Sequence, residues 1–558
     1  MSALHRRNRE SSVFKLRISH TDIGTPLEWD SAGRWTTGGS WIEPFTHPVL
    51  EYGMTVRGSD GCALIVNRER VRSTRTWCNI PANETVSDAV YVRRLAEARA
   101  WPLGFVFIEH GPEALQITAS SWGTAPIHLT APSGTLYGSW NLLDLVPHID
   151  PRSFNGAEVV RFLTYTPHYS AQTPLADVAT VTERATATYS HEGLRIDYPE
   201  PGLHALPRVL KPGADPVAFF EHELARVIDR WDFTPDTAVA DVSGGMDSAN
   251  VALTLARLHP GRVATGAMML AGDHGHQQVR RRTELLRSGF STDYRLAMMD
   301  HLPFAPGGPR ARGERFDPKE DPYAEARNLL LDAYAADGKT VVFTGLGGDE
   351  AMKVRSTEIT PGPHPTPSPL HLNSGIPAFL GEHGRRLLPS RFDGVAPIGP
   401  TLWSILECFS ALYPHYMERG LWPINPLAAP EIVRLAESLP AEWRTRKRLL
   451  RDRLHRCGFS DDVVHPRLPE NFQHILDTAM RRHGIPMLEM LLDGGAWLVQ
   501  DGYLDEAELS RAARVFARTG DRTFDVYRPL MLETGLRRLN GRSVPQPQDR
   551  AGARRDGP

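Results

Sequence analysis

Apolar residues follow two different patterns along the chain, one before and one after a break that contains prolines. From about Val13 to Ile149 they form short continuous or alternating runs, such as VFKLRI, CALIVN, GFVFIEH and LQITAS, separated by glycine, proline and asparagine. Runs of this length between turn residues predict β-strands. The stretch from Gly202 to Pro216 has several prolines and glycines and no periodicity. Such a stretch is typical of a linker, so we expect a β-rich domain before it.

After the linker the pattern changes to strands that alternate with helices. Between Val217 and Trp231 the apolar residues recur at helical spacing, which predicts a helix with one buried face. The short run TAVADV then leads into a loop with two glycines, and helical character returns from Ser248 to Leu258. VATGAMML and VVFTG are further continuous apolar runs with helical segments around them. This order predicts a parallel sheet covered on both faces.

The length of the chain indicates how many domains it has, and its net charge limits the kinds of partner it can bind. A chain of 558 residues is too long for one hydrophobic core, so two large domains are expected. We place them at residues 1–205 and 206–544, followed by a tail at 545–558 that has too few apolar residues to fold. A net charge of −3 creates no field that would gather nucleic acid or an anionic membrane.

The sequence also carries no sign of export or of a membrane span. The N-terminus is charged with no apolar stretch behind it, and no run of about 18 apolar residues occurs. The four cysteines form no CxxC pair, so neither a disulfide framework nor a zinc site is indicated. We therefore expect a cytoplasmic protein.

The loop Ser243-Gly244-Gly245-Met246-Asp247-Ser248 joins a predicted strand to a predicted helix. Its glycines allow backbone N–H groups to converge on phosphate oxygens, and the helix N-terminus adds partial positive charge. Asp247 would repel phosphate unless a cation lies between them, and Mg²⁺ is the usual cation there. The loop has neither the spacing of a kinase-type P-loop nor that of a dinucleotide fold. Taken alone, these residues also suit a tight turn with a helix cap.

A second glycine-rich loop, GLGGDE, follows the apolar run VVFTG and carries Asp349 and Glu350. Loops after the strands of an open α/β sheet lie at the same carboxyl edge, so the two loops are expected to face one ligand. Without the first loop, the second would also suit an exposed acidic turn.

The first loop resembles, residue for residue, the SGGxDS pyrophosphate loop of the ATP-pyrophosphatase superfamily, which includes asparagine synthetases, β-lactam synthetases and lasso peptide cyclases. The resemblance implies an α/β parallel sheet of the ATP-pyrophosphatase (adenine nucleotide α-hydrolase-like) type with extra helices, and ATP and Mg²⁺ as cofactors. It implies that Asp247 and Asp349 form the metal pair. The nucleotide-binding residues would be Ser243, Gly244, Gly245, Asp247, Ser248 and Gly345.

Later segments extend this resemblance, among them Glu320-Asp321-Pro322, PLAAPEIVRLAESLP and RTRKRLLRDRL. In the last of these, Lys447 falls on the family's active-site lysine. A lysine there would stabilise negative charge as pyrophosphate leaves and as a tetrahedral intermediate forms. Arg446 and Arg448 are the alternatives, and a helix this basic is also typical of a solvated face. The roles of the acidic pair before the proline and of Glu350 stay open.

The β-rich first part resembles the class II glutaminase domain of asparagine synthetases, an Ntn-type α+β fold, chiefly over LQITASSWGTAPIHLTAPSGTLYGSW. In an active glutaminase the chain begins with a catalytic cysteine whose α-amine serves as the base. This chain has Ser2 instead, followed by LHRRNRESS, which cannot form a buried strand. We therefore expect a glutaminase-like domain that releases no ammonia, ahead of an asparagine synthetase-like domain.

Leu346 stands where similar loops carry glutamate in asparagine synthetases and tyrosine in β-lactam synthetases. Leucine cannot accept or relay a proton. Together with the missing cysteine and the chain length, this favours a lasso peptide cyclase. Such an enzyme would adenylate an Asp or Glu side chain of a leader-free precursor peptide and close a macrolactam with the N-terminal amine, releasing AMP and pyrophosphate.

A leader protease and a leader-binding protein would then be further partners. Two alternatives remain open. One is a small-molecule amidation enzyme of the β-lactam synthetase or asparagine synthetase kind. The other is a catalytically dead ATP-binding partner subunit, because related folds can lose their chemistry.

Overall fold

The computed structural model describes residues 14–72, 84–122, 126–164, 169–354, 376–469 and 471–541. Ser2 with the charged segment after it, and the tail at 545–558, lie outside these ranges. Within them, no helix is long and apolar enough to cross a bilayer.

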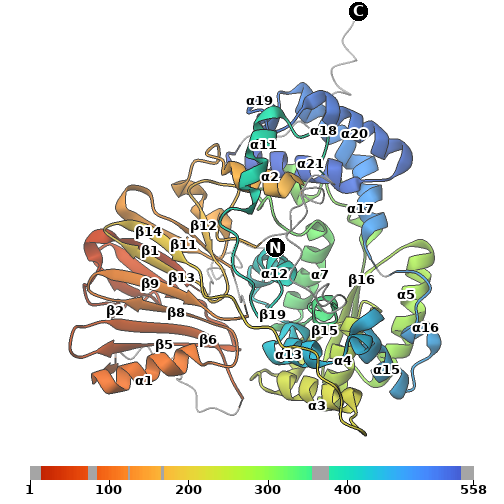
Figure 1. Cartoon of the computed structure of the whole chain (residues 1–558), viewed down its shortest axis with the longest axis horizontal. Coiled ribbons are helices and arrows are strands. Elements are labelled where there is room, and N and C mark those ends of the chain that lie inside the picture. The colour runs from red at the N-terminus through yellow and green to blue at the C-terminus, as the bar shows by residue number, and fades with distance from the viewer. Residues whose placement is uncertain are drawn as a thin grey trace, which may run out of the picture.

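The first part of the chain forms two seven-stranded sheets whose buried residues belong to one hydrophobic core (Figure 1). In one sheet every neighbouring pair is antiparallel. Buried and partly exposed residues alternate along its first strand, so Phe14, Leu16 and Ile18 face the core. In spatial order this sheet consists of β12 (Ala179–Val181), β10 (Ile127–Thr130), β11 (Thr135–Ser139), β1 (Phe14–Ser19), β4 (Ser40–Pro44), β3 (Trp35–Thr37) and β2 (Glu28–Trp29).

The second sheet is antiparallel except at its edge, where β5 and β7 run parallel. The predicted strands VFKLRI, CALIVN, GFVFIEH and LQITAS are confirmed as β1, β6, β8 and β9. The helix α1 (Asp88–Arg99) packs against β5, whereas α2 (Gly156–Thr164) packs against C-terminal helices of the second part. In spatial order the second sheet consists of β14 (Gly193–Asp197), β13 (Thr186–Ser190), β9 (Ala114–Ala119), β8 (Phe105–His110), β6 (Ala63–Glu69), β5 (Leu50–Arg57) and β7 (Glu84–Val86).

The second part is built around a five-stranded sheet in which all neighbours are parallel. This confirms the predicted parallel sheet, with the runs TAVADV, VATGAMML and VVFTG as its three central strands. Those strands are almost entirely buried, as expected for a sheet covered on both faces. In spatial order the sheet consists of β17 (Asp293–Ala297), β16 (Ala264–Met269), β15 (Ala238–Asp241), β18 (Val341–Phe343) and β19 (Trp422–Ile424).

The chain begins the sheet at its central strand, adds strands on one side and then adds strands on the other side. β15 comes first in the chain and lies at the centre; β16 and β17 extend the sheet to one side, and β18 and β19 extend it to the other. The loops that leave β15 and β18 therefore lie over neighbouring strands at the carboxyl edge of the sheet, which is the edge where open α/β sheets bind ligands. These are the two glycine-rich loops of the sequence.

Helices cover the sheet and extend beyond it (Figure 1). The predicted helix over Val217–Trp231 is α3, which begins after Asp215, whose carboxylate accepts hydrogen bonds from the N–H groups of Val217 and Ala218. The helices that matter below are α4 (Met246–Leu258), α5 (Gly272–Leu285), α7 (Ala324–Ala336), α8 (Gly348–Ala351), α12 (Trp403–Met417) and α15 (Arg448–Arg456), and the C-terminal group includes α17 (Gln473–Ala479), α18 (Ile485–Asp493), α20 (Glu506–Thr519) and α21 (Thr523–Leu539).

The edge strand β19 joins the two parts. The Trp422 side chain is 1% exposed and lies against Phe45, with ring centroids 5.8 Å apart. Its Nε1 donates a hydrogen bond of 2.7 Å to Glu69 Oε1. The predicted linker, by contrast, forms neither helix nor strand before Pro216. The two parts are therefore held together by a buried contact as well as by the connecting segment.

Candidate active site

The first glycine-rich loop turns sharply between β15 and α4. Gly244 has a φ of +95°, a left-handed conformation that favours glycine. The hydroxyls of Ser243 and Ser248 are 3.0 Å apart, and Ser243 Oγ accepts a hydrogen bond of 3.2 Å from the Gly245 N–H. The loop thus brings both serine hydroxyls to the N-terminus of α4, where the helix has unpaired N–H groups and partial positive charge.

The second loop lies directly against the first, and glycines make this contact possible. A Cβ atom added at Gly345 would overlap the backbone of Ser248, and one added at Gly348 would overlap the Asp247 carboxyl group. Gly347 has a φ of +95°, which lets the loop turn into α8. Gly345 was predicted to bind the nucleotide. In the structure it lies where the two loops touch, and because it has no side chain the loops can come together.

We expect Gly348→Ala to lower the rate of the reaction that uses this site on the order of 10²-fold, because the methyl group would displace the Asp247 carboxyl group. The sequence predicts release of pyrophosphate from ATP at this site, and the rate of that release measures the effect. Gly111→Ala is the matched control, because a Cβ atom there would meet its nearest neighbour at 3.4 Å. Equal activity of the two variants would show that the loop contact is unimportant.

Lys447 closes the cluster from a third element. Its Nζ lies 2.6 Å from Asp247 Oδ2 and 2.7 Å from Asp349 Oδ1. The two alternatives from the sequence, Arg446 and Arg448, are exposed, and Arg448 pairs with Asp452 on its own helix. The structure thus brings together Asp247, Asp349 and Lys447, which are far apart in the sequence.

The backbone at Lys447 is in an unusual conformation. Lys447 and Arg446 have φ values of +55° and +53°, which non-glycine residues seldom adopt. Arg451 Nε donates a hydrogen bond of 2.7 Å to the Arg446 carbonyl and so supports this turn. The predicted basic helix therefore begins only after Lys447, which sits at the N-terminal end of α15. Strain of this kind accumulates at functional sites.

Arg453 fixes α15 against α4 and thereby positions Lys447. It is 1% exposed and donates hydrogen bonds of 2.7 Å to the Asn250 carbonyl and 2.8 Å to Thr254 Oγ1. Asn250 in turn donates to the Met246 carbonyl over 2.8 Å, within the first turn of α4. Sequence reasoning missed Arg453, because one arginine among many in a basic segment carries no distinguishing signal.

The cluster has two carboxylates, those of Asp247 and Asp349, around the single ammonium group of Lys447. Burial raises the pKa of the Asp247 carboxyl group to about 6 although Lys447 acts in the opposite direction, and Asp349 and Glu350 add to the rise. Burial alone would lower the pKa of Lys447, but its interactions with Asp247 and Asp349 outweigh this and hold the pKa above its usual value. Asp247 Oδ1 is buried and has no hydrogen-bond partner among the described residues. One carboxylate oxygen is thus left for a further positive ligand.

These residues fit a magnesium ion. The uncommitted Asp247 Oδ1 and the carboxylate of Asp349, whose side chain is 79% exposed, are oxygen ligands of the kind Mg²⁺ prefers. Over the described ranges, no group of three or more His, Cys, Asp or Glu side chains is placed to hold a metal alone. A magnesium ion here would therefore take its remaining ligands from phosphate oxygens and water, as is usual for this ion.

Gln278, on α5, supports the first loop from behind and was not singled out from the sequence. It is 2% exposed, and its Nε2 donates hydrogen bonds of 2.9 Å to the Ser243 carbonyl and 3.0 Å to the Met268 carbonyl. Its Oε1 accepts one of 2.7 Å from the Leu270 N–H. This side chain ties the loop after β15 to the neighbouring strand β16.

The acidic pair before Pro322 lies in a network of buried ion pairs. Glu320 Oε1 is 2.7 Å from Arg310 Nη2, and Asp321 Oδ2 is 2.6 Å from Arg327 Nε. Burial raises the pKa of Glu320 to about 8, even with Arg310 beside it. Leu346 is partly buried and packs against two of the hydrophobic clusters. Neither observation adds a proton-transfer group to the cluster around Lys447.

Comparison with known proteins gives little further information. No protein-family model matches the chain, and no curated protein matches it. Two solved structures that match are described as the allosteric regulatory enzyme of purine biosynthesis and as glutamine phosphoribosylpyrophosphate amidotransferase from B. subtilis complexed with ADP and GMP. They are 10% and 9% identical to this chain, cover 53% of it in each case and 76% and 77% of their own lengths, and have TM-scores of 0.21 and 0.19. Values this low establish neither a shared fold nor a shared activity.

Proposed function

We propose that this protein is an ATP-dependent, AMP-forming carbon–nitrogen ligase that adenylates a carboxylate and transfers it to an amine. One observation carries the proposal: two glycine-rich loops at the carboxyl edge of the sheet hold Asp247 and Asp349 within 2.7 Å of the Lys447 Nζ. A helix N-terminus, two serine hydroxyls, two carboxylates and a protonated lysine are the groups that binding and activation of a nucleoside triphosphate require.

In the first step a substrate carboxylate oxygen attacks the α-phosphorus of ATP, and the bond from that phosphorus to pyrophosphate breaks. In the second step an ammonium group loses a proton, the amine attacks the carbonyl carbon, and the bond from carbon to the AMP oxygen breaks as the nitrogen loses its second proton. Negative charge builds up first on pyrophosphate and then on the tetrahedral centre. Lys447, held protonated by its two carboxylates, is the group that stabilises this charge.

The magnesium ion would be held by Asp247 and Asp349 and would screen the negative charge of the triphosphate from these carboxylates. Ser243 and Ser248 would supply hydroxyl donors to phosphate oxygens at the start of α4. On this reading the parallel sheet is of the ATP-pyrophosphatase type, and the β-rich first part is an inactive glutaminase-like domain of Ntn type.

We further propose that the carboxylate and the amine belong to one leader-free precursor peptide and that the product is a macrolactam, as in lasso peptide cyclases. Leu346 supports this choice, because its partly buried apolar side chain cannot play the proton-transfer role of the glutamate or tyrosine found there in the small-molecule relatives. Two groups on one chain react fast once they are aligned, so holding the peptide would be the main task of the protein.

The test is to supply ATP, magnesium and either leader-free precursor peptides or small amino acid derivatives, and to identify the nucleotide product. We expect AMP and pyrophosphate, formed only with a peptide, together with a peptide product lighter by one water. Turnover of a small derivative alone would instead support an amidation enzyme of the β-lactam synthetase or asparagine synthetase kind. Formation of ADP would contradict the proposal, and no turnover of any substrate would favour a catalytically dead subunit.

A further inference from the structure

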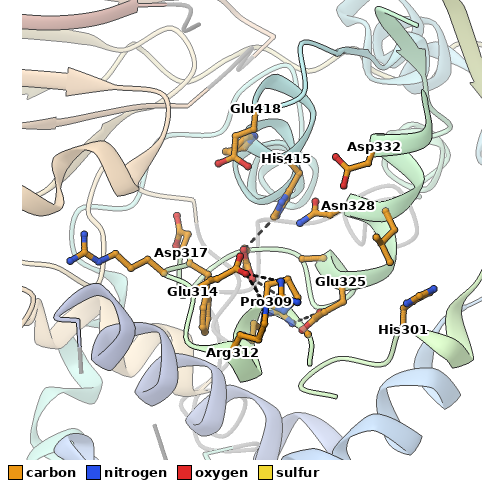
Figure 2. A pocket seen from close by; sticks show the side chains of 18 of the residues that line it. His301, Pro309, Arg312, Glu314, Asp317, Glu325, Asn328, Asp332, His415 and Glu418 are labelled. Atoms are coloured by element: carbon orange, nitrogen blue, oxygen red, sulfur yellow. Dashed lines mark hydrogen bonds and ion pairs between the residues drawn. The ribbon is translucent and has the colours of Figure 1, made fainter. Parts of the chain in front are cut away.

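A cavity of about 590 Å³ lies between the two parts of the chain (Figure 2). Asn141 and Leu143 line it from the first part, and α7, α12 and the segment before α7 line it from the second. Asn141 Nδ2 donates a hydrogen bond of 2.9 Å to Glu418 Oε1, just after α12, and so joins the two parts at the cavity wall. The described residues that line the cavity include neither Lys447 nor any residue of the two glycine-rich loops. The cavity is therefore separate from the candidate active site.

Charged side chains are abundant in the lining, and carboxylates outnumber cations. Seven carboxylates and four arginines line the cavity. Burial raises the pKa of Glu320 to about 8, and carboxylates still outnumber arginines when this residue carries a proton. Three of the arginines are already paired within the lining, namely Arg310 with Glu320 and Glu325, Arg312 with Glu314, and Arg419 with Asp332. A cavity with this balance of charge attracts cations and repels anions.

His415, on α12, is a buried polar side chain in this lining that makes no hydrogen bond with any described residue. It is 7% exposed, and its Nε2 lies 3.7 Å from Glu320 Oε2, which is too far for a hydrogen bond. Burial lowers the pKa of His415 to about 3, so the ring is neutral at physiological pH and one of its nitrogens is a hydrogen-bond acceptor. A buried acceptor of this kind is normally satisfied by a donor.

Asn328, on α7, adds a second unsatisfied acceptor. Its Oδ1 is buried and has no hydrogen-bond partner among the described residues. Figure 2 shows His415 and Asn328 among the side chains that surround the cavity. Asp300, in the segment before α7, also lines the cavity and has no ion-pair partner in the described part of the chain. An imidazole, an amide oxygen and a carboxylate are thus all available to donors from a ligand.

The spread of these acceptors favours an organic cation over a metal ion. Within the described ranges, no group of three or more His, Cys, Asp or Glu side chains is placed to hold a metal ion. The acceptors come instead from separate elements, so a ligand with donors along its length can reach them and a compact ion cannot. Ammonium groups supply both N–H donors and positive charge. The volume of the cavity is also within the roughly 300–1,000 Å³ of typical small-molecule sites.

We propose that this cavity binds a small organic cation with two or more ammonium groups, such as a polyamine. Its ammonium groups would donate hydrogen bonds to His415 and to Asn328 Oδ1, and would lie near carboxylates such as that of Asp300. The proposal does not rest on the ligase function, because the cavity and the cluster around Lys447 have no residue in common.

Isothermal titration calorimetry with the full chain, in physiological salt and without nucleotide or magnesium, tests the proposal. The probes are spermidine, butylamine, a neutral diol of similar length to spermidine, and the dicarboxylate suberate. Spermidine carries several ammonium groups and butylamine carries one. We expect the Kd for spermidine to be at least about tenfold lower than that for butylamine, and no measurable binding of the diol or of suberate.

Two variants, each with a matched control, locate the binding site. Asn328→Leu removes the unsatisfied oxygen and keeps a side chain of similar size, so it should weaken spermidine binding about tenfold. Asp300→Asn removes one carboxylate from the lining and should weaken binding about fourfold. The controls are Asn540→Leu, just after α21, and Glu489→Gln, on α18, which do not line the cavity and should leave the Kd within about twofold. Asp300 and both control residues are exposed, so these three variants should fold.

Weaker binding of spermidine by the two cavity variants than by their controls would support the proposal. It would be overturned if the native chain did not bind spermidine, if the diol or suberate bound as tightly as spermidine, or if the cavity variants and the controls bound it equally well. Because the probes need no nucleotide, any of these results would leave the proposed ligase function unaffected. Assays of pyrophosphate release without polyamine test that function separately.

Discussion

Asp247→Asn is expected to abolish pyrophosphate release, with a loss of at least about 10³-fold in kcat. The substitution keeps the size of the side chain but removes the negative charge of the carboxylate, whose Oδ2 faces Lys447 and whose Oδ1 is uncommitted. An amide is a poor ligand for magnesium, and its NH₂ group would meet the Lys447 ammonium as a second donor. The measurement is pyrophosphate release from ATP in the presence of the peptide substrate.

Asp452→Asn is the matched control for this variant. Asp452 lies on α15 and pairs with Arg448 at the surface, 3.2 Å away, so its loss should leave the activity unchanged. Thermal unfolding of Asp247→Asn should remain cooperative, because burial already disfavours the charged form of the carboxyl group that is replaced. Full activity of Asp247→Asn would refute its role in holding the metal ion.

Lys447→Ala should lower kcat by about 10²- to 10³-fold while it changes the KM for ATP much less. The physical reason is that the ammonium group faces charge that develops only as pyrophosphate leaves and as the tetrahedral centre forms. Two carboxylates hold the ammonium in place at 2.6 and 2.7 Å. Steady-state kinetics with varied ATP concentration separate the two parameters.

The exposed neighbours of Lys447 provide controls for this second prediction. Arg446→Ala and Arg448→Ala remove the same charge one residue away on the solvent side. Both variants should keep kcat within a few-fold of the native value. We allow a larger change in kcat for Arg446→Ala, because Arg446 has a left-handed backbone conformation that alanine seldom adopts. If Lys447→Ala raised the KM for ATP and left kcat intact, the lysine would bind the ground state and would not stabilise the transition state.

The features of the fold and the site that could be predicted from the sequence are those that depend on short-range patterns. The strand, glycine loop and helix around Ser243 to Ser248, and the second loop at Asp349, follow from apolar runs and glycine spacing. That they lie side by side follows from the order of the strands, in which β15 and β18 are neighbours although two other strands separate them in the chain. A sequence pattern indicates a shared sheet edge, but strand order is a property of the whole fold.

Other features depend on contacts between distant segments and left no pattern to recognise. The strand β19 has a central proline, Pro423, and is stabilised by the burial of Trp422 against the first part of the chain. Gln278 supports the first loop from a helix whose other residues are largely polar, so nothing in its sequence context distinguishes it.

The most direct test of adenylation follows the oxygen atoms of the substrate. The carboxyl group of the reacting side chain is labelled with ¹⁸O, and the nucleotide product is isolated and analysed by mass spectrometry. If the carboxylate attacks the α-phosphorus, one labelled oxygen must appear in AMP and none in pyrophosphate. Labelled inorganic phosphate together with ADP, or AMP that carries no label, would contradict the account.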